Sequence, residues 1–206
     1  MVVNGDKGHG PERRPRRQAE RTAATRRALL DAARDLFAAR GYARTAREHI
    51  VGAAGVTRGA LHHHFRNKEG LFRAVFEEME ETLAGRILAA AADAHDEAEG
   101  LRRGCAAFLD AATDPAIQQV ILIDAPAVLG WQQWRALDEV YGLGLVRDGL
   151  QMAMDAGEIR RQPVTPLAHL VLGGLNEAAL YIAGADDPAR ARLEMGGVVD
   201  RMLDAL

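Results

Sequence analysis

Apolar residues recur at intervals of three and four positions along most of this chain, and this spacing restricts it to helices. Leu29, Leu30, Ala33 and Phe37 follow the interval near the start, and later segments repeat it. A helix places residues three and four apart on one face, whereas successive residues of a strand point to opposite faces. The sequence contains no convincing period-two alternation and no hairpin signal. The pattern predicts an all-α chain of about nine helices.

Glycines and capping residues divide this pattern into separate helices. Gly41 is expected to end the first long helix, and Gly55 the next. Thr45 and Glu48 have the spacing of a capping box, in which the two side chains bind free backbone N–H groups. A long helix is expected over residues 131–156. Further helix starts are marked by N-cap residues, three of which directly precede a proline: Thr57, Asn67, Asp96, Asp114, Thr165 and Asp187.

Charge is distributed unevenly along the chain. Residues 1–78 contain 16 Lys and Arg against 9 Asp and Glu, whereas residues 79–206 contain 10 against 20. Such an asymmetry indicates a basic half that meets a polyanion. Residues 1–21 are polar and rich in Gly, Pro and Arg, so we expect a flexible basic arm there. Its Arg13, Arg14, Arg16 and Arg17 either follow the minor groove or backbone of DNA or make no ordered contact.

Two short helices joined around Gly55 have the pattern of a helix-turn-helix. Their apolar residues are expected to pack inward as a small core. The outward face of the second helix then carries Thr57, Arg58, Gly59, His62 and His63. An arginine can donate to guanine in a fork, and a glycine lets the helix backbone approach DNA closely. We interpret this face as a reader of the major groove.

The run from residue 25 to 76 resembles the DNA-binding domain of TetR/AcrR-family transcriptional regulators. The matching segments are LLDAARDLF, ARGY, AAGVTRGALHHHF and NKEGLF. The resemblance implies a helix-turn-helix domain over residues 22–68 and a helical ligand-binding and dimerisation domain over residues 69–206. It further implies a homodimer held together by the helices 165–184 and 187–206.

The same resemblance implies a ligand-responsive regulator. We expect a repressor that a mostly apolar small molecule releases from its double-stranded DNA operator, with no cofactor and no enzymatic activity. An activator, or a regulator without an effector, has the same sequence pattern. A small helical enzyme using His62–His64 or His169 is a weaker alternative, because no nucleophile, base and orienting residue form a recognisable set.

Several further residues are candidates for DNA contact. Tyr42, Thr45 and Lys68 can each meet a phosphate, although each also suits a structural role. His62 stands where the family usually has a tyrosine that holds a phosphate; a histidine can still donate, more strongly when protonated. Arg47 stands where an apolar residue is common, and it either reaches a phosphate or remains solvated. Three consecutive histidines fan out around a helix, so we expect no metal site.

The ligand site is less clearly marked in the sequence. We expect it among the apolar middle helices, with candidate lining residues Phe108, Ile121, Trp131, Trp134, Met152, His169 and Asn176. Core packing is the alternative for the two tryptophans, and a structural partner is the alternative for His169, Asn176 and Asp124. Polar residues inside the apolar window 166–185 favour a buried or interfacial helix over a membrane span. With Cys105 as its one cysteine, the chain fits the reducing cytoplasm.

Overall fold

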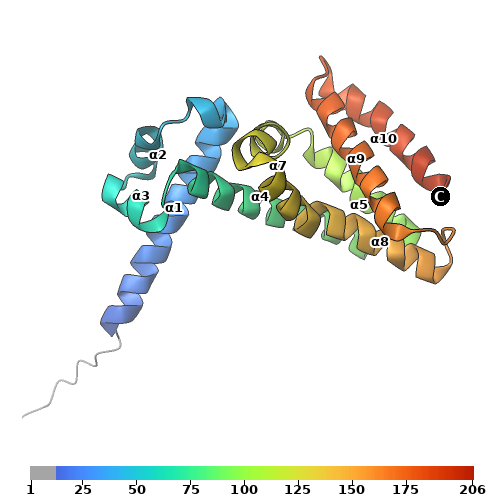
Figure 1. The fold of residues 1–206 in the computed structure, drawn as a ribbon, viewed down its shortest axis with the longest axis horizontal. Helices are drawn as coiled ribbons and strands as arrows, with labels where there is room; N and C mark the ends of the chain where they lie inside the picture. The colour runs from blue at the N-terminus through green and yellow to red at the C-terminus, as the bar shows by residue number, and fades with distance from the viewer. Residues whose placement is uncertain (1–12) are drawn as a thin grey trace, which may run out of the picture.

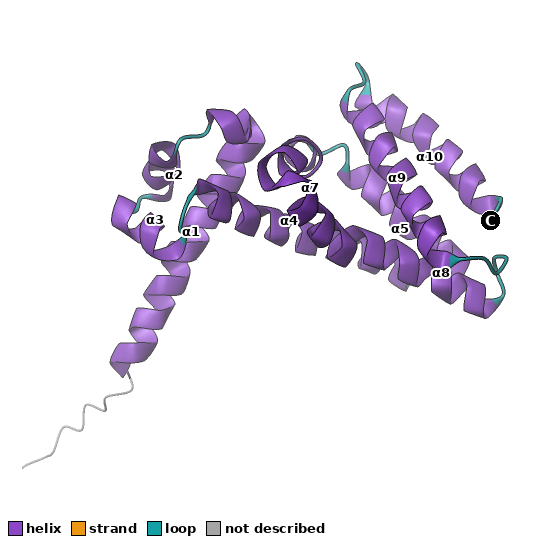
Figure 2. Cartoon of the chain, in the orientation of Figure 1, coloured by secondary structure: helices purple, strands orange, loops and turns teal. Residues whose placement is uncertain are grey.

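The structure is a computed structural model, and it describes residues 13–206. Figures 1 and 2 show that the regular elements of this part of the chain are all helices, which confirms the all-α prediction. The elements are α1 (Arg13–Arg44), α2 (Arg47–Ala54), α3 (Arg58–His64), α4 (Lys68–Ala92), α5 (Glu97–Ala111), α6 (Pro115–Ile117), the π-helical η1 (Gln118–Asp124), α7 (Ala125–Asp138), the π-helical η2 (Glu139–Leu143), α8 (Gly144–Ala156), α9 (Val164–Ala183) and α10 (Pro188–Asp204). In Figure 1, α1 to α3 gather at one end, and α4 runs from them towards α5, α8, α9 and α10.

Two glycines interrupt helices that would otherwise be continuous. Gly41 (φ 75°, ψ 162°) ends the straight part of α1, and Gly130 (φ 74°, ψ 156°) breaks α7. Both have positive φ, a region that side chains with a Cβ rarely enter. If consecutive α and π segments are joined, residues 13–206 form eight helices, close to the predicted nine. The predicted helix over residues 131–156 begins directly after the break at Gly130 and ends with α8 at Ala156.

Most of the predicted helix starts are confirmed. Asn67 accepts a hydrogen bond from the Gly70 amide at 2.7 Å, and Thr57 accepts one from the Ala60 amide at 3.2 Å. Asp96, Asp114 and Asp187 cap α5, α6 and α10 in the same way. The prediction for Thr165 was wrong, because the N-cap of α9 is Pro163, two residues earlier, and it makes no side-chain cap hydrogen bond.

The predicted capping box at Thr45 was also wrong. The N-cap of α2 is Ala46, whose amide donates to His49 Nδ1 at 3.3 Å. The Thr45 side chain is 1 % exposed, and its hydroxyl donates to the Gly41 carbonyl at 2.9 Å and the Leu36 carbonyl at 3.2 Å. The hydroxyl is drawn inward because the chain reversal at Gly41 leaves helix-end carbonyls that need donors. Thr45 is therefore not placed to meet a DNA phosphate.

The first helix begins within the segment 1–21 that was predicted to be a flexible arm. α1 begins at Arg13, so residues 13–21 are not an irregular arm. Pro15 is tolerated there because the amides of a helix's first turn have no partner within the helix. Residues 1–12, and the side chains of residues 13–17, lie outside the described part of the structure. The predicted DNA contacts of Arg13, Arg14, Arg16 and Arg17 concern those side chains.

The buried side chains form two apolar clusters. The first joins α1 to α4 with η1 and the start of α7, and its fully buried members include Phe37, Phe72, Phe76 and Val120. The second joins α5, α8, α9 and α10 around residues such as Leu150. The helix-turn-helix end therefore shares one core with the middle of the molecule. Within residues 13–206, no helix combines the length and apolarity needed to cross a membrane.

We expect the substitution Phe72→Ala to lower the free energy of unfolding by about 3–5 kcal/mol. Phe72 is fully buried and packs edge-on against Phe37 and Tyr42, with both ring centroids at 5.2 Å. Urea denaturation followed by circular dichroism at one protein concentration measures the change. Val140→Ala is the control, since Val140 is exposed and its loss should cost less than about 0.5 kcal/mol. Equal losses in the two variants would contradict this packing.

Candidate functional site

The turn between α2 and α3 has the geometry of a helix-turn-helix. Gly55 has left-handed backbone angles (φ 64°, ψ 29°), and the Val56 amide donates to the Val51 carbonyl at 3.2 Å. This closes α2 and lets α3 start two residues later at an angle to it. Ile50, Leu61 and Phe65 are buried beneath the turn, as the sequence pattern predicts.

The outward face of α3 is open to solvent. Thr57, Arg58, Gly59, His62 and His63 are all exposed. Arg58 Nη2 lies 3.5 Å from Glu48 Oε1, and both side chains are largely solvated, so this ion pair contributes little and leaves Arg58 free to rotate. A Cβ built on Gly59 would have only the Thr57 hydroxyl within 4 Å, at 3.8 Å. The first turn of α3 is therefore bare enough for close approach by another molecule.

The three histidines differ in environment. His62 and His63 are exposed, whereas His64 is half-buried with its ring 5.3 Å from that of His63. Partial burial, followed by the charges of His63 and Arg26, lowers the pKa of His64. In the described residues, no three His, Cys, Asp or Glu side chains gather where they could hold a metal ion. His64 is the last residue of α3, and it is less exposed than His62 and His63.

Tyr42 is the centre of a junction between three helices. Its amide donates to Asp124 Oδ2 at 2.7 Å, and its carbonyl accepts from Lys68 Nζ at 2.6 Å. The Lys68 ammonium also lies over the Tyr42 ring, 3.8 Å from its centroid, and partial burial lowers its pKa. The contacts tie the end of α1 to the start of α4 and the end of η1. Sequence reasoning noted Asp124 but not its partner, which lies 82 residues away.

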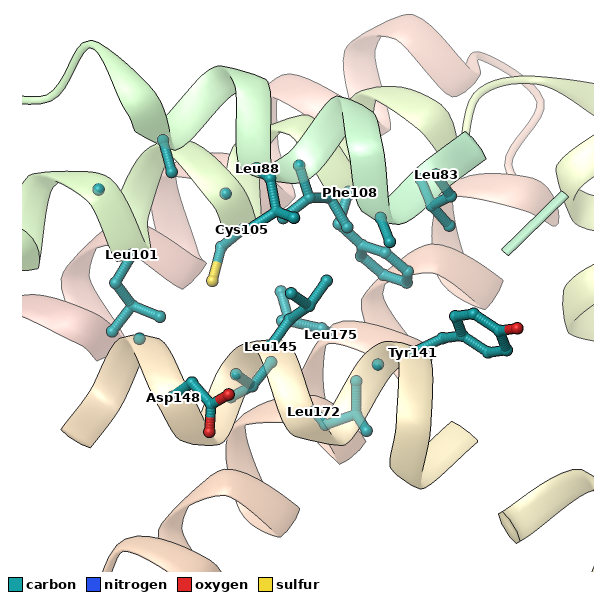
Figure 3. Close-up of a pocket in the computed structure, with 18 of the residues that line it drawn as sticks. Leu83, Leu88, Leu101, Cys105, Phe108, Tyr141, Leu145, Asp148, Leu172 and Leu175 are labelled. Carbon is teal, nitrogen blue, oxygen red and sulfur yellow. The ribbon is translucent and has the colours of Figure 1, made fainter. Parts of the chain in front are cut away.

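A cavity of about 770 Å³ lies between α4, α5, η1, α7, η2, α8 and α9. Figure 3 shows Leu88, Leu145 and Leu175 around it, with the Phe108 ring facing the space between α5 and α8. Five of the predicted ligand residues line this cavity: Phe108, Ile121, Trp134, Met152 and Asn176. The cavity is large enough for a drug-sized molecule and is mostly apolar.

The other two predicted ligand residues lie elsewhere. Trp131 directly follows the Gly130 break and is 67 % exposed, and its ring lies tilted against that of Trp134 with the centroids 5.3 Å apart. His169 is exposed, and its Nδ1 lies 2.7 Å from Arg135 Nη2. Neither lines the cavity, which corrects the prediction for both. One residue's difference in register along a helix decides which side a residue faces, and the sequence does not give that register.

The cavity also holds acidic groups that sequence reasoning missed. Glu80 and Asp138 both line it. Burial, reinforced by the charge of Asp138, raises the pKa of Glu80 to about 7. Burial also raises the pKa of Asp138, although Arg135 Nη1 pairs with its carboxylate at 3.0 Å. Glu80 stands three and seven residues before Leu83 and Ile87 on the same face of α4, but this spacing alone does not separate it from the other glutamates of residues 77–81.

One surface of α9 and α10 is apolar and exposed. Leu170 and Leu193 are each 75 % exposed, and Tyr181, Val198 and Met202 are exposed with them. A Cβ added at Gly173 or Gly174 would have no neighbouring atom within 4 Å, so the α9 backbone is accessible there. Large apolar side chains that gather in the open on neighbouring helices are candidates for an interaction site.

Comparison with known proteins matches both halves of the chain. A family described as "Bacterial regulatory proteins, tetR family" matches residues 29–75, and one described as "Tetracyclin repressor-like, C-terminal domain" matches residues 98–206. Among curated proteins, the HTH-type transcriptional regulator TtgR of Pseudomonas putida is 41 % identical over 90 residues, or 44 % of this chain and 41 % of TtgR. The chain thus spans about two-fifths of the length of such relatives.

Solved structures extend the likeness to nearly the whole chain. A TetR-family regulator from Pectobacterium atrosepticum is 33 % identical, with a TM-score of 0.78 over 91 % of this chain and 96 % of that one. FadR from Bacillus subtilis, in complex with stearoyl-CoA, has a TM-score of 0.70 at 19 % identity over 84 % and 96 % of the two chains, which shows the fold alone. The chain belongs to the TetR family of bacterial transcriptional regulators.

Proposed function

We propose that this protein is a homodimeric, cytoplasmic repressor that leaves its DNA operator when a small molecule fills the cavity. The observation that carries the proposal is the shared core: the helix-turn-helix and one wall of the cavity belong to a single buried cluster. A molecule bound in the cavity can therefore act on the position of α3 without a flexible linker between them. The division into a DNA-binding part, residues 22–68, and an effector and dimerisation part, residues 69–206, follows the same proposal.

The DNA contacts are assigned to the exposed face of the helix-turn-helix. Arg58, at the start of α3, is placed to donate to a guanine edge, and Gly59 allows the helix to lie deep in the groove. Thr57, His62, His63 and Arg47 are the candidates for phosphate contact. Tyr42 and Lys68 hold the junction to α4 instead, since the Lys68 ammonium already donates to the Tyr42 carbonyl.

The dimer is assigned to α9 and α10. Their exposed leucines would be covered by the same surface of a second copy, as a two-fold interface requires. The accessible glycines of α9 allow the helices of the two copies to approach closely. Dimerisation places two copies of α3 at a fixed separation, and two half-sites on one face of DNA need about 34–36 Å between them.

The effector mechanism is a shift between two arrangements of the dimer. Ile121, Leu122 and Pro126 line the cavity and flank Asp124, whose carboxylate holds the Tyr42 amide. A molecule that pushes on these residues displaces the junction and with it the helix-turn-helix. Such a molecule lowers the operator affinity only to the extent that it binds the displaced arrangement more tightly than the DNA-binding arrangement. FadR with stearoyl-CoA and RolR with resorcinol show that this fold can hold small molecules.

We expect Arg58→Ala to weaken binding to the operator by about 1–3 kcal/mol, or roughly 5- to 150-fold. The fluorescence anisotropy of a labelled operator, obtained by selection from random duplexes, measures the affinity at fixed salt. Arg161→Ala is the matched control, because Arg161 is as exposed as Arg58 but pairs with Asp155 at the far end of the molecule. If both variants bind like the unchanged protein, Arg58 does not read a base.

We expect Leu170→Glu to convert the dimer into a monomer that retains its helical content. The buried charges of two facing glutamates would repel each other and lack partners. Sedimentation velocity measures the mass, and the operator affinity should fall at least about tenfold, since a monomer occupies a single half-site. Val140→Glu, on another exposed apolar position, should remain dimeric. A dimeric Leu170→Glu protein would place the interface elsewhere.

A further inference from the structure

Glu80 is an acidic side chain on an otherwise apolar wall of the cavity. The cavity-facing side of α4 carries Glu80 followed by Leu83, Ala84, Ile87 and Leu88 at helical spacing. The described residues provide Glu80 with neither a hydrogen bond nor an ion pair, although its carboxyl is largely removed from bulk water. An unpaired carboxylate in such a place is costly unless a bound group compensates it.

The surrounding charges leave this end of the cavity negative. Asp138 of α7 is also in the lining, and its side chain is 12 % exposed. The Arg135 guanidinium pairs with Asp138 at 3.0 Å and contacts His169 of α9 at 2.7 Å, so it is already occupied.

The other groups around Glu80 add no positive charge. From η2, the Tyr141 hydroxyl donates to Glu81 of α4 at 3.5 Å. Burial, together with the nearby charges of Glu81, Glu77 and Glu80, raises the pKa of Tyr141, which therefore stays neutral. Glu77 is paired with Arg73 at 2.8 Å and is not among the residues that line the cavity. The balance of these groups favours a positive charge beside Glu80.

Aromatic and aliphatic side chains complete the lining. Trp134, Tyr141 and Phe108 contribute aromatic rings to the same cavity. The faces of such rings attract organic cations, most strongly where water is excluded. Figure 3 shows Leu145, Leu172 and Leu175 along the rest of the space, which suits a hydrocarbon body.

We propose that the cavity binds an amphipathic organic cation, with the hydrocarbon body among the leucines and the positive charge beside Glu80. This inference rests on the proposed function in one respect, namely that the cavity is the effector site. A long-chain carboxylate is disfavoured, because its charge would add to those of Glu80 and Asp138. A neutral molecule that accepts a hydrogen bond from protonated Glu80 is the competing ligand class.

The proposal has a pH signature. Without a ligand, Glu80 has a pKa of about 7, so it is mostly protonated at pH 6 and mostly charged at pH 8. A permanently charged ligand favours the ionised carboxylate, so its binding displaces the proton. The affinity should therefore rise about tenfold from pH 6 to pH 8 and level off above that. His95 also lines the cavity, where it follows the end of α4.

The test uses two fluorescent probes that differ in charge. Diphenylhexatriene is a neutral rod, and its trimethylammonium derivative carries a fixed positive charge on the same rod. We would measure the dissociation constants of both for the full-length dimer by fluorescence at pH 6, 7 and 8. The charged probe should bind at least tenfold more tightly than the neutral one at pH 8, and this preference should shrink about tenfold at pH 6, while the neutral probe should show no rise.

Three variants identify the group responsible. Glu80→Gln should remove the preference for the charged probe and its pH dependence but leave neutral-probe binding intact, which also shows that the cavity is still formed. Glu77→Gln removes a carboxylate that is paired with Arg73 and does not line the cavity, so this variant should behave like the unchanged protein. His95→Ala should retain the pH dependence. Equal affinities of the two probes at pH 8, or an unchanged charge preference in Glu80→Gln, would overturn the proposal. Tighter binding of the neutral probe would instead select the neutral ligand class.

Operator binding, measured in the same samples, separates this inference from the proposed function. If the charged probe binds at Glu80 but never releases DNA, the cation site stands and the effector role fails. If the protein binds no duplex at low salt, the repressor proposal fails, whatever the probes show. If the protein binds its operator normally and discriminates neither probe, only the cation inference fails.

Discussion

The orientation of the helix-turn-helix depends on one residue, Tyr42, and the three contacts that hold it. Its amide binds Asp124, its carbonyl binds Lys68, and its ring packs against Phe37 and Phe72. These groups come from α1, α4 and η1, so the junction joins segments that are far apart in the chain. Gly41 makes it possible, because its positive φ turns the chain just before Tyr42. Each contact alone contributes a small stabilising free energy, but together they hold the helix-turn-helix in one orientation.

The same junction connects recognition with sensing. η1 ends at Asp124, and Leu122 and Pro126, two residues before and two after it, line the cavity. The π-helical backbone of η1 departs from ideal helical hydrogen bonding, and such departures are often found at functional sites. A close-packed core transmits displacement because it cannot compress. In the proposed mechanism, the shared core between α1, α4 and η1 is the physical route from the cavity to α3.

The predictability of the site differed between its two halves. The helix-turn-helix could be recognised because its function needs a local pattern: Gly55 at the turn, a cap at Thr57 and exposed residues directly after it. Glu80 could not be recognised because it lies in the run EEMEE, residues 77–81, which is typical of a solvated acidic face. Its neighbours Glu77 and Glu81 do have partners near the surface. Glu80 differs from Glu77 and Glu81 in being buried in the cavity lining, and only the packing of α7 and η2 over α4 creates that difference.

The sequence by itself determined the features that depend on residues close together in the chain. Helical periodicity, the stops at Gly41 and Gly55, and the caps at Asn67 and Asp96 each involve residues within a turn or two of one another. The tertiary structure alone decided that Thr45 points inward, that Trp131 faces out while Trp134 lines the cavity, and that Asp124 meets Tyr42. Those outcomes depend on how whole helices are rotated and placed against each other. That placement is set by the summed packing of many side chains, which no local pattern encodes.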